Sequence, residues 1–274
     1  MINNLPFNMN ILEKKLAKNL RKNILQLSNK AKSSHIGGCL SIVEILTVLF
    51  SGTLKKISLK SNKYKDTFIL SKGHACLALY CMLYEKKILD KKTLFSYGQN
   101  GTLLMSHASH HVPGVKFSTG SLGHGLPVAV GSALAAKLEK KNRKVYVLIS
   151  DGELNEGTTW ESLMFASHHK LDNLCVIIDY NKIQGLTFVS KIIKIEPLLK
   201  KISSFGCNVK NIDGHNIFKI KKALILNKTN KPRVIIANTI KGKGVSFMEN
   251  KIAWHYKSPN NVELKNALEE IENA

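Results

Sequence analysis

The sequence predicts an α/β fold in which a mostly parallel sheet is flanked by helices on both faces. Three apolar, β-branched runs, at residues 144–150, 174–178 and 232–240, are typical of strands that are buried on both sides. A stretch with helical spacing separates the first two runs, which gives the strand–helix–strand unit from which parallel sheets are built. We expect one domain over residues 1–274, since the chain shows no repeat, linker or change of composition.

The helix between the first two strands is expected to start at a capping box. Thr158 and Glu161 have the Ser/Thr-x-x-Glu spacing in which side chains satisfy the free backbone N–H groups of a helix start. The other elements are expected, in chain order, as a helix at 10–30, a turn-rich loop at 33–39, a helix at 40–50, a strand at 66–70, a helix reaching residue 84, a helix of small residues around 129–136, a basic-faced helix within 186–231, a loop at 206–214 and a helix at 261–273.

Composition limits the classes of function. The net charge is +22, but only three basic residues are arginines and the lysines are spread along the whole chain, so a nucleic-acid partner is not expected. Such lysines favour solubility and attract phosphorylated ligands. The five cysteines form no C-x-x-C pair and are expected to be reduced and buried. The sequence has no apolar stretch long enough to span a membrane, and its first residues do not follow the basic, apolar and small-residue pattern of a signal peptide. The chain is therefore expected to be cytoplasmic, with no membrane partner.

Two polar residues directly follow two of the predicted strands. Asp151 comes after the run at 144–150, and Asn181 comes shortly after the run at 174–178. Because the carboxyl ends of parallel strands form the edge where open α/β sheets bind ligands, we expect the two side chains to lie there. Their oxygens suit Mg²⁺ or Ca²⁺, and Mg²⁺ usually completes its shell with phosphate oxygens. A calcium loop of the EF-hand kind is excluded, since Ser162 stands where that loop needs glutamate.

Histidines mark further candidate segments. His35 precedes Gly37-Gly38, where backbone can approach a ligand closely, and His74 lies at a helix start that would favour a phosphate. Residues 105–125 contain four histidines and a run of glycines. Zinc is the rival interpretation for these histidines, but the segment has no H-E-x-x-H pattern and no nearby cysteine ligand.

Together these motifs resemble the N-terminal, diphosphate-binding domain of transketolases, which has the thiamine diphosphate-binding fold. The resemblance rests on blocks that occur in family order and cover nearly the whole chain: SHIGGCLS, LSKGHA, SHASHHVPGVKFSTGSLGHG, SDGELNEGTTWE, DYNKIQG and WHYKSP. It implies transfer of a two-carbon ketol unit from a ketose phosphate to an aldose phosphate. The implied cofactors are thiamine diphosphate and Mg²⁺, for which Ca²⁺ or Mn²⁺ could substitute.

The resemblance also implies roles for individual residues. The metal would be bound by Asp151, Asn181 and the backbone carbonyl of Ile183. Contacts with thiamine diphosphate would come from His74, Gly120, Leu122, Asp151, Gly152, Asn181 and His255, and from Glu156, which matches a glutamate of the network at the subunit interface. The catalytic histidines would be His35, His74, His107 and His255, since imidazoles titrate near neutral pH and suit proton transfer.

The active site implied by the resemblance is incomplete in this sequence. In the family, a pyrimidine-binding domain supplies the glutamate that activates the cofactor, so the sequence resembles the N-terminal subunit of a split transketolase. We expect a C-terminal partner subunit, with two copies of each chain in a heterotetramer. Ile36, Ala108 and His124 depart from the family pattern and leave the choice of sugar open. The alternatives are a transketolase specialised for an unusual sugar, a subunit like those of 2-oxo acid dehydrogenases, and a cofactor-binding scaffold without catalysis.

Overall fold

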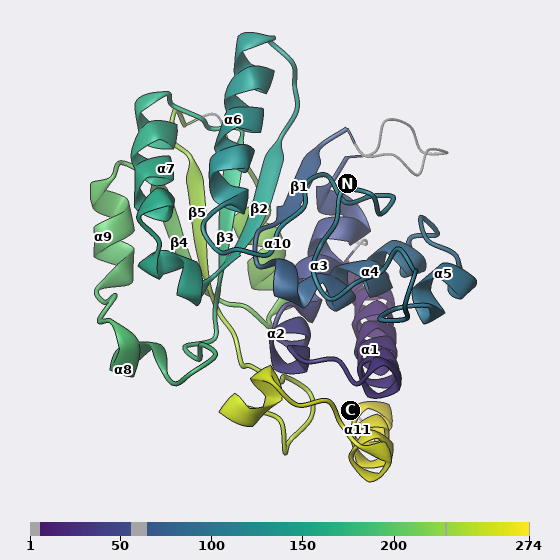
Figure 1. Ribbon diagram of the computed structural model, residues 1–274. Coiled ribbons are helices and arrows are strands. Elements are labelled where there is room, and N and C mark those ends of the chain that lie inside the picture. Colours follow the sequence, from purple (N-terminus) through teal and green to yellow (C-terminus); the bar gives the residue numbers. More distant parts are fainter. Residues whose placement is uncertain (1–5, 56–64, 228, 274) are drawn as a thin grey trace.

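Five parallel strands form one sheet at the centre of the computed structural model, which describes residues 6–55, 65–227 and 229–273 (Figure 1). The strands are β1 (Thr67–Leu70), β2 (Val145–Ser150), β3 (Leu174–Tyr180), β4 (Asn208–Asp213) and β5 (Arg233–Asn238), and they lie in the order β1-β2-β3-β5-β4. Every neighbouring pair is parallel. The predicted α/β class with a parallel sheet is therefore confirmed.

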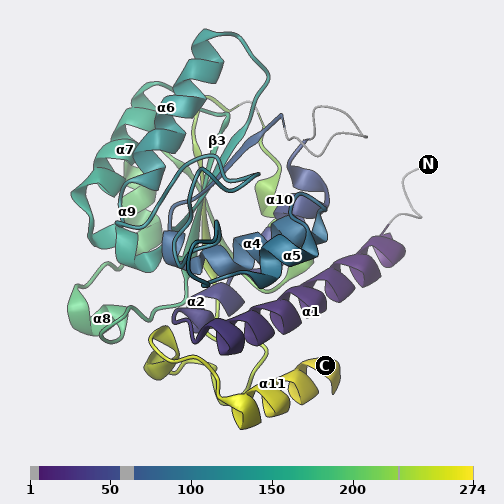
Figure 2. The ribbon, with the colours of Figure 1, turned by 45° about the vertical axis from the view of Figure 1, so that its right-hand side comes forward.

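Helices cover both faces of this sheet. One face packs against α1 (Pro6–Ala31), α2 (Ile36–Leu40), α3 (Val43–Val48), α4 (Cys76–Glu85), α10 (Ile217–Leu224) and α11 (Asn261–Asn273), and the other against α6 (Gly125–Leu138), α7 (Gly157–His168) and α9 (Leu198–Ser204). Two short helices, α5 (Lys91–Phe95) and α8 (Val189–Ile192), lie in the connections. Figures 1 and 2 show α11 alongside α1, where the Asn29 side chain donates to the Pro259 carbonyl at 2.8 Å.

The strands divide the core into two apolar layers. Along β2, Tyr146 and Leu148 face the layer that contains α1 and α4, whereas Val147 and Ile149 face the layer with α6 and α7. Because successive side chains point to opposite faces and both faces are covered, the strand has a continuous apolar run instead of an alternating one. All five cysteines are buried and free, as expected. Within the described ranges, no helix has both the length and the apolar character needed to cross a bilayer.

Two elements differ from the prediction. The stretch 206–214 contains the edge strand β4 instead of a loop, because a half-exposed edge strand needs no apolar run. The loop expected at 33–39 contains most of α2, and the helix expected at 40–50 is α3, which is divided from α2 at residues 41–42 and continues into a π-helical turn, Leu49–Thr53. The division lies at Ser41, whose hydroxyl is 3.1 Å from the Gly38 carbonyl and donates to the Asp179 carboxylate at 2.7 Å.

The start of α7 also differs from the prediction. Glu156 is the N-cap residue of this helix and makes no side-chain capping hydrogen bond. The capping box lies eight residues before the predicted one, at the 3₁₀ turn Asp151–Asn155, where the side chains of Ser150 and Glu153 bond each other's backbone N–H groups. This box fixes the path of the chain directly after β2, at the edge of the sheet where the candidate site lies.

Candidate functional site

A cavity of about 160 Å³ opens at the carboxyl ends of β1, β2, β3 and β5. Its wall contains seven residues that the sequence singled out: His74, Leu122, Asp151, Gly152, Asn181, Ile183 and His255. Six others complete it: Gly38, Lys72, Ser150, Gln184, Gly185 and Lys241. The cavity therefore joins segments that are far apart in the sequence at the edge where ligands bind in open α/β sheets.

Asp151 and Asn181 present oxygens from neighbouring strand ends. One carboxylate oxygen of Asp151 accepts a hydrogen bond from the Lys182 N–H at 2.7 Å, and the other has no partner in the described part of the chain. The Asn181 amide donates to Asp179 at 3.0 Å and accepts from the Ile183 N–H at 3.1 Å, which fixes its oxygen in place. Asp151 is only 2% exposed, and burial followed by the nearby Asp179 charge raises its pKa to about 7.

Beneath the cavity lies a buried ion pair that sequence reasoning missed. The Lys72 ammonium donates to the Asp179 carboxylate at 2.5 Å, and both side chains are almost fully buried. Hydroxyls of Ser41 and Thr239 also donate to this carboxylate. Burial by itself would raise the pKa of Asp179, but the Lys72 charge and the hydrogen bonds hold it below its usual value. The only signal in the sequence was an aspartate inside the apolar run of β3.

Lys241 is a second lysine of the cavity wall. Its ammonium donates to the Ile183 carbonyl at 3.1 Å and lies 3.0 Å from Nδ1 of His255. Because an ammonium group can only donate, Nδ1 of His255 must accept, and the proton of this neutral imidazole is on Nε2. Burial, followed by the charge of Lys72, lowers the pKa of Lys241 to about 8. Sequence reasoning did not single out this residue.

A second buried network holds the loop that carries Lys241. Arg21 donates from Nε to the Lys243 carbonyl at 3.0 Å, and the Ile240 N–H donates to Nε2 of His215 at 2.8 Å. Glu44 lies between them, 2.5 Å from Arg21 and 2.9 Å from His215. The loop is therefore tied to α1 and α3 on both sides of the lysine, so its ammonium is held against the Ile183 carbonyl.

The four predicted catalytic histidines form one cluster. The ring centroid of His35 is 4.9 Å from that of His255, 5.2 Å from that of His74 and 6.1 Å from that of His107. Burial and neighbouring positive charges lower the pKa of His35 to about 4 and that of His255 to about 3, and they also lower the pKa of His74 well below its usual value. These three imidazoles are therefore neutral at physiological pH.

The other singled-out residues lie at varying distances from this centre. Gly120 lies against His107, because a Cβ atom at Gly120 would be 3.3 Å from the imidazole ring. Glu156 is exposed at the surface and is not part of the cavity wall. Glu153 is fully buried instead and accepts hydrogen bonds from Ser71, Gly123 and Ser150. Of the four histidines in 105–125, only His107 joins the cluster; His110, His111 and His124 are exposed.

The donor set of the cavity fits a hard metal ion beside a diphosphate. Asp151, Asn181 and the Ile183 carbonyl are oxygen donors, which suit Mg²⁺, Ca²⁺ or Mn²⁺. The Ile183 carbonyl already accepts from a cationic group, the Lys241 ammonium. No three or more His, Cys, Asp and Glu side chains within the described residues are arranged to hold a metal, so further ligands would come from a bound phosphate. The charge of Lys241 would balance part of the charge of such a phosphate, whereas that of Lys72 is already paired with Asp179.

Comparisons with known proteins agree with this geometry. Residues 12–270 match the family model described as "Transketolase, thiamine diphosphate binding domain". The chain is 43% identical over 272 residues to an apulose-4-phosphate transketolase subunit of Actinobacillus succinogenes, covering 97% of this chain and 98% of that one. It is 40% identical over 258 residues to the 6-deoxy-6-sulfo-D-fructose transketolase subunit SqwG of a Clostridium species, covering 92% and 94%.

A solved structure extends the match to the fold. The transketolase of Campylobacter jejuni superposes with a TM-score of 0.86 at 30% identity, over 98% of this chain. The chain spans 43% of the length of that transketolase, so the match is to a part of the longer polypeptide. With the family model covering most of its length, the chain belongs to the transketolase family, in which it corresponds to the thiamine diphosphate-binding domain.

Proposed function

We propose that the chain is the N-terminal subunit of a cytoplasmic transketolase that depends on thiamine diphosphate and Mg²⁺ and moves a two-carbon ketol unit from a ketose phosphate to an aldose phosphate. One observation carries the proposal: Asp151, Asn181 and the Ile183 carbonyl meet two buried lysines in a cavity at the sheet edge. An oxygen donor set next to positive charge suits a metal-bound diphosphate. Ca²⁺ or Mn²⁺ could replace Mg²⁺ in such a set.

Different residues of the chain would bind the metal, the diphosphate and the rest of the cofactor. Thiamine diphosphate, when bound, supplies the carbon nucleophile for breaking and forming the C–C bond. Asp151, Asn181 and Ile183 would hold the metal, and Lys241 would offset part of the diphosphate charge. Gly152 and Leu122 would line the cofactor, with a Cβ at Gly152 only 3.4 Å from the Leu122 side chain.

The neutral histidines would handle protons and sugar hydroxyls. His74 and His255 line the cavity, whereas His35 and His107 are the other two members of the cluster and would line the path to it. A neutral imidazole can accept a proton at one nitrogen while it donates from the other, which suits a reaction in which substrate hydroxyls lose and regain protons. The retained cluster disfavours the alternative of a scaffold without catalysis.

A partner subunit would complete the site. Two relatives carry the word subunit in their names, and the chain aligns with less than half of the Campylobacter transketolase. We infer that a C-terminal subunit with a pyrimidine-binding domain docks over the cavity, and that two copies of each form a heterotetramer. Glu156, exposed beside Gly123, would face this interface.

The choice of sugar has a second candidate. The relatives from Actinobacillus and Clostridium are named for apulose 4-phosphate and for 6-deoxy-6-sulfo-D-fructose, neither of which is an ordinary pentose phosphate. The names therefore support a transketolase that is specialised for an unusual sugar. Assaying the complex of chain and partner against xylulose 5-phosphate, apulose 4-phosphate and the sulfosugar would separate these candidates. Membership of the transketolase family leaves the 2-oxo acid dehydrogenase alternative without support.

Calorimetric titration with thiamine diphosphate, with and without Mg²⁺, tests the proposed site. Asp151→Asn should weaken Mg²⁺-dependent binding by about a hundredfold or more, because the metal loses a charged ligand. Glu161→Gln is the control, since this carboxylate is exposed on α7 and is not part of the cavity wall. Equal binding by both variants would contradict the assigned metal site. Ketol transfer by the chain copurified with its partner, lost in Asp151→Asn, then tests the reaction.

A further inference from the structure

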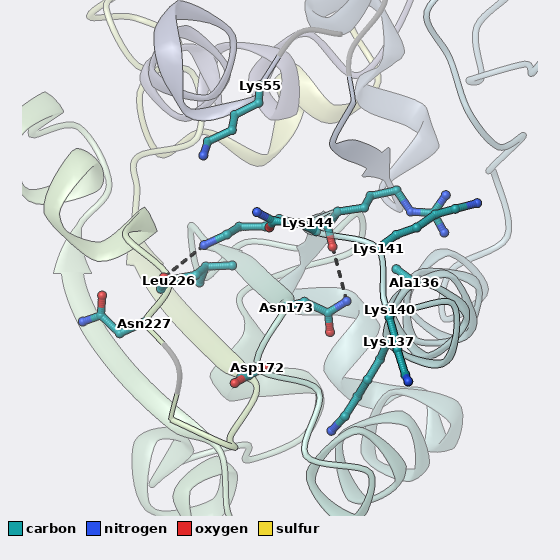
Figure 3. Close-up of a pocket in the computed structure, with 12 residues that line it drawn as sticks. Lys55, Ala136, Lys137, Lys140, Lys141, Lys144, Asp172, Asn173, Leu226 and Asn227 are labelled. Atoms are coloured by element: carbon teal, nitrogen blue, oxygen red, sulfur yellow. Dashed lines mark hydrogen bonds between the residues drawn. The ribbon is translucent and has the colours of Figure 1, made fainter.

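A second and larger cavity lies at the opposite edge of the sheet from the cofactor site. It has a volume of about 640 Å³ and is lined by residues before β1, β2 and β3, by the last turn of α6 and the residues after it, and by residues that follow α10 (Figure 3). Of the twelve lining residues in the described part of the chain, six are cationic and one, Asp172, is anionic. Lysine and arginine make up 41 of the 274 residues of the chain, so this cavity is enriched in positive charge well beyond the general composition.

The backbone around this cavity is held by buried polar groups. The carboxylate of Asp66, only 2% exposed, accepts from the backbone N–H groups of Lys55 and Lys144, both at 3.0 Å. The Asn173 amide donates to the Ala133 carbonyl at 2.9 Å and to the Arg143 carbonyl at 3.3 Å. Lysines from two separate segments are thus fixed around one opening, which lowers the entropic cost of gathering them on a ligand.

Most of the charge at this opening is not neutralised. Lys141 pairs with Glu139 at 2.9 Å, but Lys137 and Lys144 donate only to backbone carbonyls and keep their full charge. The ammonium groups of Lys55 and Lys140 have no partner among the described residues, and neither is in contact with a carboxylate there. Figure 3 shows Lys55 reaching in from the segment before β1, and Lys137 and Lys140 extending from the end of α6 and the turn after it.

An unsatisfied donor adds to this charge. Nη2 of Arg143 donates to the Ser132 carbonyl at 3.3 Å, while Nε is buried and has no partner in the described part of the chain. The described residues of the cavity wall include no aromatic side chain on which a base could stack, and the apolar ones among them are Ala136 and Leu226. Recognition at this opening would therefore rest on charge and hydrogen bonding to anionic groups.

We propose that this cavity binds a small anion with several phosphate groups, such as a chain of two or three phosphates. The volume accommodates such an anion, and the lysines can surround it from two sides of the opening. A single phosphate would meet only part of the charge. A polynucleotide would gain no base stacking from the described residues of the wall, because none of them is aromatic.

Calorimetric titration with inorganic tripolyphosphate at about 0.15 M ionic strength, where screening removes weak long-range attraction, tests the proposal. Lys55→Ala combined with Lys140→Asn should weaken binding by about tenfold or more, because two uncompensated charges are lost. Asparagine suits position 140, where φ is 53°. Both lysines are exposed, so the double variant should keep the wild-type thermal midpoint.

Lys200→Ala combined with Lys219→Ala is the matched control, since it removes two exposed lysines of α9 and α10 that do not line the cavity. The titration is repeated in Lys241→Met, because the cofactor site also presents lysines to phosphates. This variant should bind tripolyphosphate as tightly as the wild type does, since it keeps Lys55 and Lys140. The proposal is overturned if both double variants weaken binding equally, or if tripolyphosphate does not bind at this salt concentration. Tighter binding of a single-stranded oligonucleotide through Lys55 and Lys140 would also overturn it.

Discussion

The histidines at the cofactor cavity are held neutral by their surroundings. His35 and His255 have pKa values lowered to about 4 and about 3, mainly by burial and further by the charges of neighbouring groups that include Lys241. His255 additionally accepts from that lysine, which fixes its tautomer. The positive charge of Lys241 therefore helps to keep the adjacent imidazoles neutral at physiological pH.

These pKa values predict how the stability of the protein depends on pH. In the unfolded chain the histidines take up protons near pH 6.5, whereas in the folded protein His35 and His255 do so only near pH 4 and pH 3. The unfolded state therefore binds more protons between these values, and stability is lost as the pH falls below about 6.5. The urea midpoint of the cofactor-free chain should decline between pH 7 and pH 4.

The variant His255→Gln isolates one contribution to this decline. Glutamine can still accept from Lys241 but does not titrate, so the loss of stability between pH 7 and pH 4 should be smaller than in the wild type. His110→Gln, an exposed position outside the cluster, is the control. An identical acid-side slope in wild type and His255→Gln would show that the burial of this histidine does not govern the pH dependence.

The turn after β2 depends on the buried carboxylate of Glu153. One oxygen accepts from the Ser150 N–H at 2.9 Å and the other from the Gly123 N–H at 3.1 Å and from the Ser71 hydroxyl. Burial raises the pKa of this carboxyl group. Because both oxygens face donors, no single replacement of the carboxylate by an amide can satisfy all of them.

Glu153→Gln should therefore lower the free energy of unfolding by about 2 kcal/mol, since one N–H donor would face the amide NH₂ group. Glu161→Gln is the matched control: it occupies the same position of the competing Ser/Thr-x-x-Glu pattern but is exposed, so it should change stability by less than about 0.5 kcal/mol. Urea unfolding of both variants measures the difference. If both variants lower the free energy of unfolding equally, the capping box at Glu153 does not stabilise the protein more than an exposed glutamate does.

The elements that the sequence predicted well are those whose pattern reflects burial alone. The strands β2, β3 and β5 are covered on both faces, so each is a continuous apolar run that is visible without knowing its partners. The edge strand β4 has no such pattern. The Ser/Thr-x-x-Glu spacing occurs both at Ser150–Glu153 and at Thr158–Glu161. Ser71 and Gly123 donate hydrogen bonds to Glu153, and these long-range contacts favour the first segment as the capping box.

The candidate site was predictable to the extent that its residues follow strands directly. Asp151 and Asn181 are placed by the ends of β2 and β3, and their meeting follows from a parallel sheet. The pair of Lys72 and Asp179 was missed, because its members are 107 residues apart and each is uninformative alone. Likewise, nothing local distinguishes His107, which joins the histidine cluster, from His110 and His111, which do not.

As a whole, the molecule exposes apolar side chains beside its cofactor cavity. Leu186, 83% exposed, directly follows Gln184 and Gly185 of the cavity wall, and Phe188 lies two residues further on. Exposed apolar side chains next to an open site are typical of surfaces that a partner covers. This arrangement fits a site that a second subunit closes, so this segment is the place to test the proposed assembly.

Leu186→Ser should weaken the association with the C-terminal subunit by about tenfold or more, because the apolar area that the partner would cover is lost. Phe218→Ser is the matched control: Phe218 is 73% exposed on α10, which packs on the opposite face of the sheet from α7 and α9. Sedimentation of the mixed subunits measures both. If Leu186→Ser associates normally with the C-terminal subunit, the interface does not include this segment. If only Phe218→Ser fails to associate, the interface lies on the α10 face. Since Leu186 adjoins the cavity without lining it, its loss should lower activity only through assembly, and an excess of partner should restore ketol transfer.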